Sequence, residues 1–502
     1  MKQQKFLFLF LLPVALNAFA QPAFKQMAPQ EMQHELAILK TSLTSLHPGI
    51  YRYETPSQID ADFATAFEKV KQPLPENRYM ILIAQLLTHA HCGHTYTNYW
   101  NQTEKVGSDL FSKSYMPFLY KMIGKEMVIT HNLSGADQIR VGDRVIAING
   151  LPVTRIVDSL LTVSLSDGLH GLPRKIDNIN IEPSDIGSAN FNMADIYIPL
   201  FFPQLFNTAS YRLTIQHYPY GKPFEVNVLS LNKKNRMAVY EQRFGVLPIH
   251  EQDWSLKILT KQTACFTIGG FDTWAWKKDY RILLDSIFTV LKKQHIANLI
   301  VDIRGNVGGA DDARDEVFTY LTDKPFGCTD PLTKRVRFLT VPDTLTPYLK
   351  TWDKSFKQPK NPADYRQLPD GLYENIKESQ EACITVQPKP NRFTGKIFLL
   401  IDNRNSSTTF TLAKLFKTMH TGKIIGETTG GNQQGINGGQ FFFLYLPYSG
   451  LEIDIPLTWG AYIGNRPDTG IEPDYFVPTT RQTLSAKKDA QIEFALKRIR
   501  NK

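Results

Sequence analysis

The feature that most constrains the fold is a strand, a turn of small polar residues and a helix in direct succession. Residues 397–401 form an apolar run that predicts a buried strand, and Asn405, Ser406 and Ser407 follow it. Apolar residues then recur at helical spacing over 411–419. A hydroxyl on such a turn lies at a sheet edge, beside helix N-terminal N–H groups that can stabilise an oxyanion. The stretch predicts a serine nucleophile, and the alternative is that the two serines only cap the helix.

The length and composition of the chain indicate a globular protein of several domains. A chain of 502 residues is too long for one hydrophobic core, so we expect two or three domains. The formal net charge is +9, but the Lys and Arg residues are scattered along the sequence. Because scattered basic residues are typical of a solvated surface, we expect no nucleic-acid partner.

The first twenty residues have the pattern of an export signal. Lys2 and Lys5 precede an apolar run at 6–16, and small residues at 18–20 suit a cleavage site. We therefore interpret residues 1–20 as a signal peptide. Since no other run is long enough to cross a bilayer, we expect a soluble periplasmic or extracellular protein without an integral membrane span.

Four cysteines are too few for a disulfide scaffold. Cys328 and Cys383 flank most of an irregular stretch, and an oxidising compartment would allow them to form a disulfide that closes this loop. Cys92 lies in the histidine-rich stretch 89–94 and is expected to stay reduced.

Two regions precede the nucleophile region. Residues 21–110 are expected to form a small helical domain, with helices at residues 29–46, 57–71 and 77–89. Residues 111–240 change to short strands, expected at residues 118–120, 127–129 and 142–150. The stretch 134–150, closed by an Asn-Gly turn, resembles the core of a PDZ domain, which would bind an extended peptide at a sheet edge. Residues 153–232 are interpreted as an insertion or the wall of a substrate channel.

Residues 241–502 alternate between strand and helix patterns, which favours an α/β sheet. Strands are expected at residues 264–268, 298–303 and 396–401, and helices at residues 279–292, 311–321 and 411–419. The Pro-rich, charged stretch 324–392 interrupts this alternation and is interpreted as an insertion or lid.

Three separated stretches together resemble one protein family. Residues 299–309 resemble the Asp-x-Arg-x-Asn-x-Gly-Gly strand and loop of the tail-specific, or C-terminal processing, serine proteases. Ser407 with its helix and the downstream turn at 426–431 looks like their nucleophile segment, and 470–474 resembles their closing Gly-[Val/Ile]-x-Pro-Asp motif. With the PDZ-like region, the resemblance covers most of the chain in the same order. It implies a crotonase-like α/β catalytic core behind a helical and a β-rich domain.

The resemblance also bears on the general base. One branch of the family uses a Lys about two dozen residues after the serine, but residues 430–433 contain none, and Phe410 replaces the usual acidic residue. His94 stands in a Gly-His-Thr context, as in the tricorn-like branch. Histidine suits this role because its unperturbed pKa lies near neutrality.

A zinc site is the alternative for this histidine-rich stretch. The competent ligands are His89, His91, Cys92 and His94, but their spacing matches no familiar zinc motif. Alternation would place His89 and His91 on one face and His94 on the other. The Gly-rich stretch 430–435 lacks the Lys and the residue order of a phosphate-binding loop. We therefore expect neither a metal nor another cofactor.

The remaining site residues follow from the resemblance and from the nucleophile. The oxyanion hole is expected from the backbone N–H of Thr408 and of Gly308 or Gly309. The resemblance implies that the tricorn-like branch takes the acid that orients its histidine from just before the closing motif, where Pro467 stands at the first expected position and Asp468 is the best candidate. Asp302 and Arg304 are expected to form a structural ion pair.

Taken together, these patterns predict an exported serine endopeptidase. It would cleave peptides or unfolded chain ends through an acyl-enzyme at Ser407, with His94 as the base and the PDZ-like region docking or gating the substrate. The alternative is a catalytically inactive, ligand-binding relative of the same fold, which Phe410 keeps open.

Overall fold

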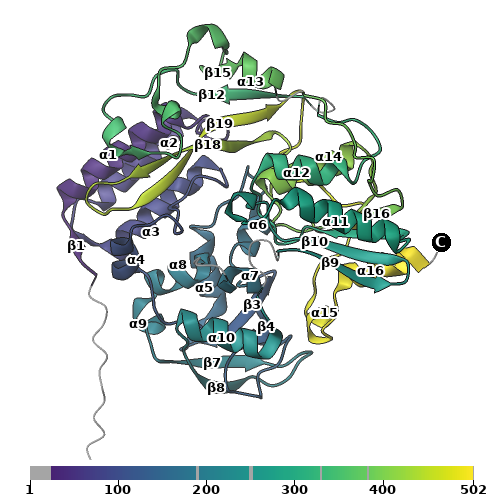
Figure 1. Ribbon diagram of the computed structural model, residues 1–502. Helices are drawn as coiled ribbons and strands as arrows, with labels where there is room; N and C mark the ends of the chain where they lie inside the picture. Colours follow the sequence, from purple (N-terminus) through teal and green to yellow (C-terminus); the bar gives the residue numbers. More distant parts are fainter. Residues whose placement is uncertain (1–23, 188–191, 248–252, 328–330, 382–383, 501–502) are drawn as a thin grey trace, which may run out of the picture.

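The computed structural model describes residues 24–187, 192–247, 253–327, 331–381 and 384–500 (Figure 1). The expected signal peptide and the expected Cys328–Cys383 disulfide lie outside these residues and stay predictions. Cys92 and Cys265 are buried free thiols. No helix among the described residues is long and apolar enough to cross a membrane.

The N-terminal region is helical, and its three main helices lie within two residues of the expected ranges. The elements are β1 (Gln26–Met27), α1 (Pro29–Leu46), α2 (Pro56–Lys69), β2 (Leu74–Pro75), α3 (Glu76–Leu87), η1 (Thr88–Ala90) and α4 (Glu104–Leu110). Helix α1 begins with a proline, which lacks the N–H that this position leaves unpaired, and it ends at Leu46, because His47 before Pro48 is extended. Leu36, Leu39 and Leu43 form its buried face.

The middle region is built on a sheet in the order β3-β4-β5-β7-β8, with β6 paired to β5. Its strands are β3 (Phe118–Ile123), β4 (Glu126–Asn132), β5 (Arg144–Ile148), β6 (Leu151–Pro152), β7 (Ser210–Gln216) and β8 (Phe224–Leu229). Asn149 and Gly150 have φ of 50° and 81°, as a type I′ turn requires, so the expected hairpin turn is confirmed.

The stretch interpreted as an insertion contains helices and also strands β7 and β8 of this same sheet. Its helices are α5 (Val153–Leu161), α6 (Leu172–Asp177), α7 (Pro183–Gly187), α8 (Met193–Phe201) and α9 (Pro203–Phe206), and α10 (Lys233–Phe244) follows β8. The chain therefore leaves the sheet after β6, forms a helical layer and returns to complete the sheet.

The third region contains the expected α/β sheet, in the order β20-β17-β16-β11-β10-β9. Neighbouring strands are parallel except β9 and β10. The strands are β9 (Trp254–Thr260), β10 (Thr263–Ile268), β11 (Asn298–Asp302), β16 (Lys396–Ile401), β17 (Lys423–Gly426) and β20 (Tyr475–Phe476). The helices are η3 (Thr273–Ala275), α11 (Tyr280–Lys293), α12 (Asp311–Thr319), α14 (Ser407–Thr418), α15 (Arg481–Ser485) and α16 (Ala490–Arg500).

Both faces of this sheet are covered, which explains why its strands are continuous apolar runs. Leu399 and Ile401 of β16 belong to the core beneath α11, α12 and α14. Phe398 and Leu400, which alternate with them, pack with Ala495 of α16 on the opposite face. The strand that precedes the candidate nucleophile is therefore fixed from both sides.

A further antiparallel sheet combines strands of the insertion with two long strands that follow α14, in the order β13-β18-β19-β12-β15-β14. Its strands are β12 (Leu332–Val336), β13 (Leu349–Lys350), β14 (Tyr365–Gln367), β15 (Tyr373–Asn375), β18 (Gly435–Tyr445) and β19 (Glu452–Tyr462). The insertion also contains η4 (Thr346–Tyr348), η5 (Lys354–Lys357), η6 (Pro362–Asp364) and α13 (Ile376–Glu381). The stretch read as an insertion or lid thus supplies four of the six strands.

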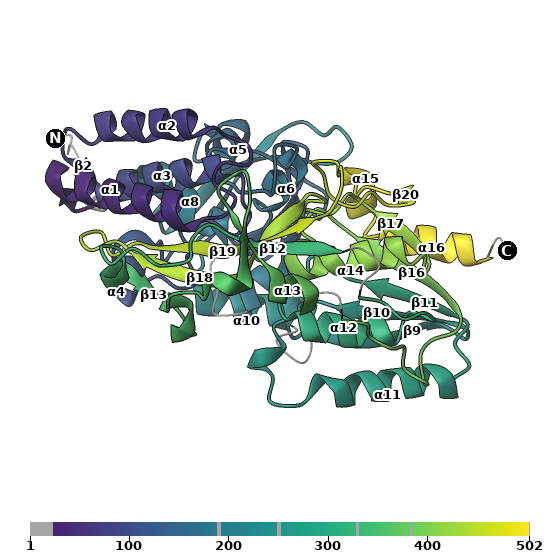
Figure 2. The same ribbon diagram turned by 90° about the horizontal axis from the view of Figure 1, so that it is seen from above.

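Strands β18 and β19 connect the α/β region to the N-terminal helices (Figure 2). Phe442, Ile453 and Ile455 lie in the same hydrophobic core as Leu39 and Leu43 of α1. Chain segments about 400 residues apart in sequence therefore share one core, so the N-terminal helices and the end of the chain stabilise each other.

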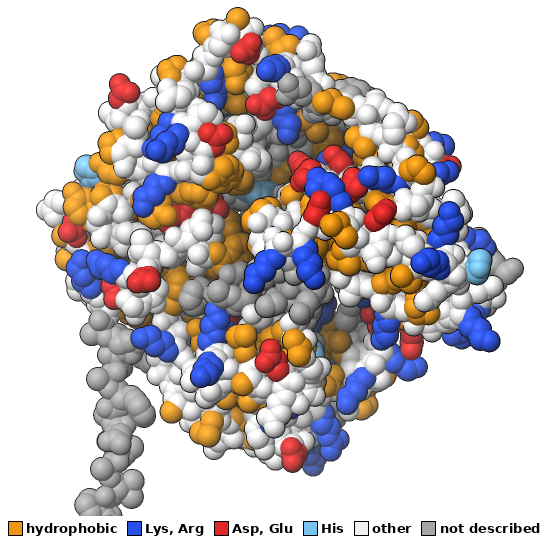
Figure 3. Space-filling view, in the orientation of Figure 1, with side chains coloured by type: hydrophobic (Ala, Val, Ile, Leu, Met, Phe, Trp, Pro, Cys, Tyr) orange, Lys and Arg blue, Asp and Glu red, His pale blue; other side chains and the backbone are white. Residues whose placement is uncertain are grey.

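Lys and Arg side chains are distributed over the face shown in Figure 3, and they form no continuous basic patch on it. This distribution agrees with the scattered basic residues of the sequence. The same face is hollowed near its centre, between the β18–β19 side and the α12–α14 side.

A buried ion pair holds α8 against α10. The Arg236 guanidinium donates to both carboxylate oxygens of Asp195 at 3.1 and 2.6 Å, and both side chains are at most 4% exposed. The guanidinium also lies over the Tyr115 ring at 4.5 Å. Burying two charges is costly, so the pair stabilises this layer only as long as both partners are present.

We expect Asp195→Ala to lower the free energy of unfolding by about 3–5 kcal/mol, because it leaves the Arg236 charge buried and unpaired. Thermal and urea unfolding of the full chain measure this change. The double variant Asp195→Leu with Arg236→Met should lose less stability than the single variant. A single variant as stable as the unmodified protein would contradict this account.

Candidate active site

The loop between β16 and α14 places Ser407 at the start of the helix in a left-handed backbone conformation, with φ of 52°. This conformation is strained for a residue with a Cβ and has to be held by its surroundings. Asn405 supplies part of that support, because its buried amide donates to the carbonyls of Ile303 and Asn306 at 2.6 and 3.1 Å. The turn is thereby tied to the loop that follows β11.

The two serines of this turn have different environments. Ser406 is buried and its Oγ donates to the Val307 carbonyl at 3.1 Å, without capping α14. Ser407 is half-buried, and its Oγ has no hydrogen-bond partner among the described residues. The Ser406 side chain therefore does not cap the helix. Among the described residues, the Ser407 hydroxyl forms no hydrogen bond that would hinder its reaction with a substrate.

The neighbouring glycine loop lies directly against Ser407. A Cβ on Gly308 would be 2.7 Å from the Ser407 Cβ, and Gly308 has φ of 127°, so only glycine fits there. Its N–H, however, already donates to Asn306 Oδ1 at 2.9 Å. In the part of the chain that the structure describes, the N–H groups of Thr408 and Gly309 have no acceptor. Of the three expected oxyanion donors, these two are therefore unengaged.

Two further contacts fix these donors. Thr408 Oγ1 donates to the Gly309 carbonyl at 2.8 Å, and Thr409 Oγ1 donates to Asn306 Oδ1 at 2.6 Å. The first turn of α14 is therefore bonded to the glycine loop through side chains and leaves backbone N–H groups of both segments unused. Helix N-terminal N–H groups carry partial positive charge, which suits a developing oxyanion.

His94 lies on the segment after α3 and η1, against strand β18. Its ring atoms are 3.7–3.9 Å from the position that a Cβ on Gly438 would take, and its ring centroid is 5.8 Å from that of Phe441. Its backbone N–H donates to Cys92 Sγ at 3.4 Å. Its Nδ1 is buried and has no hydrogen-bond partner among the described residues.

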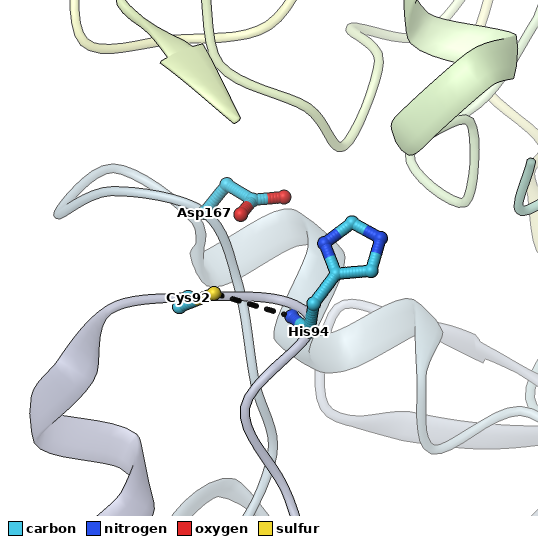
Figure 4. Close-up of side chains that lie close together, drawn as sticks. All are labelled: Cys92, His94 and Asp167. Atoms are coloured by element: carbon cyan, nitrogen blue, oxygen red, sulfur yellow. Dashed lines mark hydrogen bonds between the residues drawn. The ribbon is translucent and has the colours of Figure 1, made fainter. Parts of the chain in front are cut away.

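The carboxylate beside His94 is Asp167. One oxygen of Asp167, a ring nitrogen of His94 and Cys92 Sγ all lie within 4.8 Å of one another, and Figure 4 shows the Asp167 carboxylate next to the imidazole. Asp167 is held in place by the Gly93 N–H, which donates to it at 3.0 Å. No motif in the sequence pointed to Asp167, because it lies in a loop between α5 and α6.

The charges around His94 determine its protonation. Burial lowers the pKa of His94 below its ordinary value, the Asp167 carboxylate acts in the opposite direction, and Arg174 adds to the lowering. The imidazole is therefore neutral near neutral pH, as a proton acceptor must be. Burial also raises the pKa of the Cys92 thiol to about 11, so this thiol stays protonated.

Arg174 connects the surroundings of His94 to the nucleophile loop. Its guanidinium donates to the carbonyls of Asn403 and Arg404, just before the turn that carries Ser407. Gly430 leaves room for this contact, because a Cβ there would lie 2.8 Å from the Arg174 side chain. Sequence reasoning gave no indication of Arg174 either.

Asp468, the acid expected from the resemblance, has other partners. Its carboxylate accepts from Tyr53 at 2.8 Å, from Asn432 at 2.5 Å and from the Leu169 N–H at 2.9 Å. These three donors use both of its oxygens, and none of its hydrogen bonds goes to His94. The expected ion pair of Asp302 and Arg304 is confirmed, with the closest contact at 2.6 Å.

The four residues weighed as zinc ligands divide between two clusters. His89 Nδ1 lies 3.0 Å from both Glu54 and Asp62, and His91 Nε2 lies 3.3 Å from Glu54. Cys92 and His94 lie with Asp167 in the other cluster. The separation of His89 and His91 from His94 agrees with the expectation, but the segment is a 3-10 helix and turn rather than an alternating strand.

Comparisons with known proteins find relatives of this fold and of part of this sequence. Two structures of mature CPAF, one of them complexed with lactacystin, have TM-scores of 0.61 and 0.60 at 15% and 14% identity. Each covers 93% of this chain, and the chain covers 97% and 95% of them. At these identities the likeness shows a shared fold. No match was found among curated protein sequences.

The sequence profile of peptidase family S41 matches residues 267–477, which extend from β10 through the glycine loop, Ser407 and α14 to β20. This region of the chain therefore carries a peptidase family S41 domain, which supports a serine-type peptidase of the tail-specific protease family.

Proposed function

We propose that this serine-type peptidase is an exported endopeptidase that cleaves peptides and unfolded chain ends through an acyl-enzyme at Ser407. The observation that carries the proposal is the unengaged Ser407 hydroxyl, held on a left-handed turn beside the unengaged N–H groups of Thr408 and Gly309. A nucleophile and two oxyanion donors are thus present on adjoining loops. Export rests on the signal-like pattern of residues 1–20.

In the proposed mechanism, His94 removes the Ser407 proton as the hydroxyl attacks the scissile carbonyl. The carbonyl oxygen becomes an oxyanion that accepts from Thr408 and Gly309, and the amine leaves with the proton from His94. Water then hydrolyses the acyl-enzyme with the same base.

Asp167 serves in this proposal as the positioning residue for His94, in place of Asp468. It is the carboxylate beside the imidazole, and its contact with Gly93 fixes it to the segment that carries His94. Hydrogen bonds of catalytic groups in substrate-free enzymes are often long and shorten when substrate binds. Asp468 stabilises the loop around Tyr53 and Asn432 instead.

Replacing the two serines one at a time tests the nucleophile. Ser407→Ala should lower kcat by roughly 10⁴–10⁶-fold and abolish labelling by an organophosphonate, because the nucleophile is lost. Its free energy of unfolding should change by less than about 1 kcal/mol, since no hydrogen bond is removed.

The matched control, Ser406→Ala, should show the opposite pattern. It loses the bond to Val307 and hence about 1 kcal/mol of stability, with most activity retained. A label found on Ser406 would contradict the assignment. An unlabelled protein that still binds peptide would support the alternative of an inactive ligand-binding relative.

The dependence of rate on pH tests the base and its acid. We expect kcat/KM to rise with pH as His94 loses its proton, with a midpoint below the ordinary histidine pKa of about 6.5. Asp167 raises the pKa of His94, so Asp167→Asn should move this midpoint to lower pH and also lower kcat. The rate is measured between pH 4 and 9 with one fluorogenic peptide.

The matched control for this experiment is Asp468→Asn, which should leave the midpoint unchanged. A shifted midpoint in Asp468→Asn together with an unchanged one in Asp167→Asn would restore Asp468 as the acid. Full activity of His94→Ala would contradict the base itself, whereas His89→Ala should lose little activity.

A further inference from the structure

A cavity of about 510 Å³ opens where the loop after α1 meets strands β12 and β19. Four guanidinium groups line it, and they are accompanied by a single carboxylate, that of Asp370. The arginines are Arg52, Arg335, Arg337 and Arg466. The cavity is therefore cationic, whereas the face of the protein shown in Figure 3 has no continuous basic patch.

Arg52 and Arg337 are held by neutral oxygens. Arg52 donates to the Gly435 carbonyl and to the Tyr53 hydroxyl, both at 3.1 Å. Arg337 Nε donates to the His47 carbonyl at 2.8 Å. Among the residues that the structure describes, neither guanidinium forms an ion pair with an acidic group. Their positions are therefore fixed while their charges stay unneutralised.

Trp459 fixes two of the guanidiniums against one ring. The Cζ atoms of Arg52 and Arg335 lie 4.3 and 5.0 Å from the centroid of its indole. The distance from Arg335 to Asp370 is 4.0 Å, at the limit of an ion pair, and Asp370 is half exposed. Stacked guanidiniums lose little freedom when they bind a ligand, and their planar fork matches a carboxylate.

The positive charges that line the cavity act on a histidine buried behind it. His47 is fully buried there, and its Nε2 lies 2.8 Å from Thr95 Oγ1. Burial, followed by the charges of Arg337 and Arg52, lowers the pKa of His47 to about 3. The histidine therefore stays neutral and does not add to the positive charge of the cavity.

Strand β18 connects the cavity to the active site. Gly435, which accepts from Arg52, begins this strand, and Gly438, three residues further on, lies against the His94 ring. At about 3.3 Å per residue, the two points are separated by about 10 Å. An extended peptide of three to four residues is long enough to span that distance.

We propose that this cavity is a substrate subsite that binds an acidic side chain of the peptide a few residues from the scissile bond. The proposal rests on the proposed peptidase function and extends it to the class of substrate. Arginine binds carboxylates through paired, charge-assisted hydrogen bonds, and Arg335 and Arg337 present such donors together. A carboxylate at the end of the peptide offers the same chemistry, so the experiment includes both sources.

Peptide binding to the full-length Ser407→Ala protein tests the proposal without cleavage. The probes are fluorescent eight-residue peptides with an amidated C-terminus, in which a single Glu is moved along the sequence, each paired with its Gln counterpart. We expect one position at which Glu binds about tenfold more tightly than Gln at low salt. High salt should reduce this difference, because it screens the charges.

Arg335→Gln, in the same Ser407→Ala background, should abolish this preference, and Arg337→Gln provides a second variant if the first does not fold. The matched control is Arg366→Gln, on strand β14 of the same sheet, because Arg366 is exposed and paired with Glu374 outside the cavity. This control should keep the tenfold difference.

The binding data distinguish the two sources of the carboxylate and also show whether the subsite exists. If a free C-terminus binds more tightly than its amide and Arg335→Gln removes that difference, the carboxylate comes from the chain end and the subsite stands. Equal affinity of all charged and neutral peptides, a loss of preference in Arg366→Gln, or no peptide binding at all would overturn it. Organophosphonate labelling of the unmodified protein tests the nucleophile separately, so failure of one proposal is not mistaken for failure of the other.

Discussion

The geometry of the candidate site depends on the buried guanidinium of Arg404, three residues before the proposed nucleophile. It lies 3.0 Å from carboxylate oxygens of both Glu182 and Asp185, which belong to the middle region. Burial would raise the pKa of Glu182, but Lys121 and Arg404 lower it to about 2, so the contact stays ionic. Because an unpaired buried charge costs several kcal/mol, the loop that carries Ser407 reaches this geometry only against the folded middle region.

The N-terminal region is held to the site by a second set of contacts, which run through β19. The Asp454 N–H donates to the Tyr96 carbonyl at 3.0 Å, and the Asn98 amide donates to the Asp454 carboxylate at 2.8 Å. These bonds fix the segment that carries His94 onto the β18–β19 pair. The proposed nucleophile, base and positioning acid therefore come from three regions, and the α/β sheet alone lacks two of the three residues.

The sequence was most informative where the pattern is local. The amphipathic α1, the Asn149-Gly150 turn and the strand–turn–helix around Ser407 are each specified by neighbouring residues, and all three are present. Strands such as β13 are only two residues long and pair with β18, about 90 residues away, so no periodicity reveals them. Asp167 escaped detection for a similar reason, because only tertiary packing brings its loop to His94.

The packing around position 410 explains why a phenylalanine stands there. Phe410, where the resemblance would place an acidic residue, is fully buried, and a Cβ on Gly431 would lie 2.4 Å from its ring. The position belongs to the core beneath α14, where an unpaired carboxylate would be costly. A chain with a hydrophobic side chain at this position has to take its acid from another segment. In the proposed mechanism Asp167 is that acid: it lies beside His94, comes from the middle region and accepts a hydrogen bond from the N–H of Gly93.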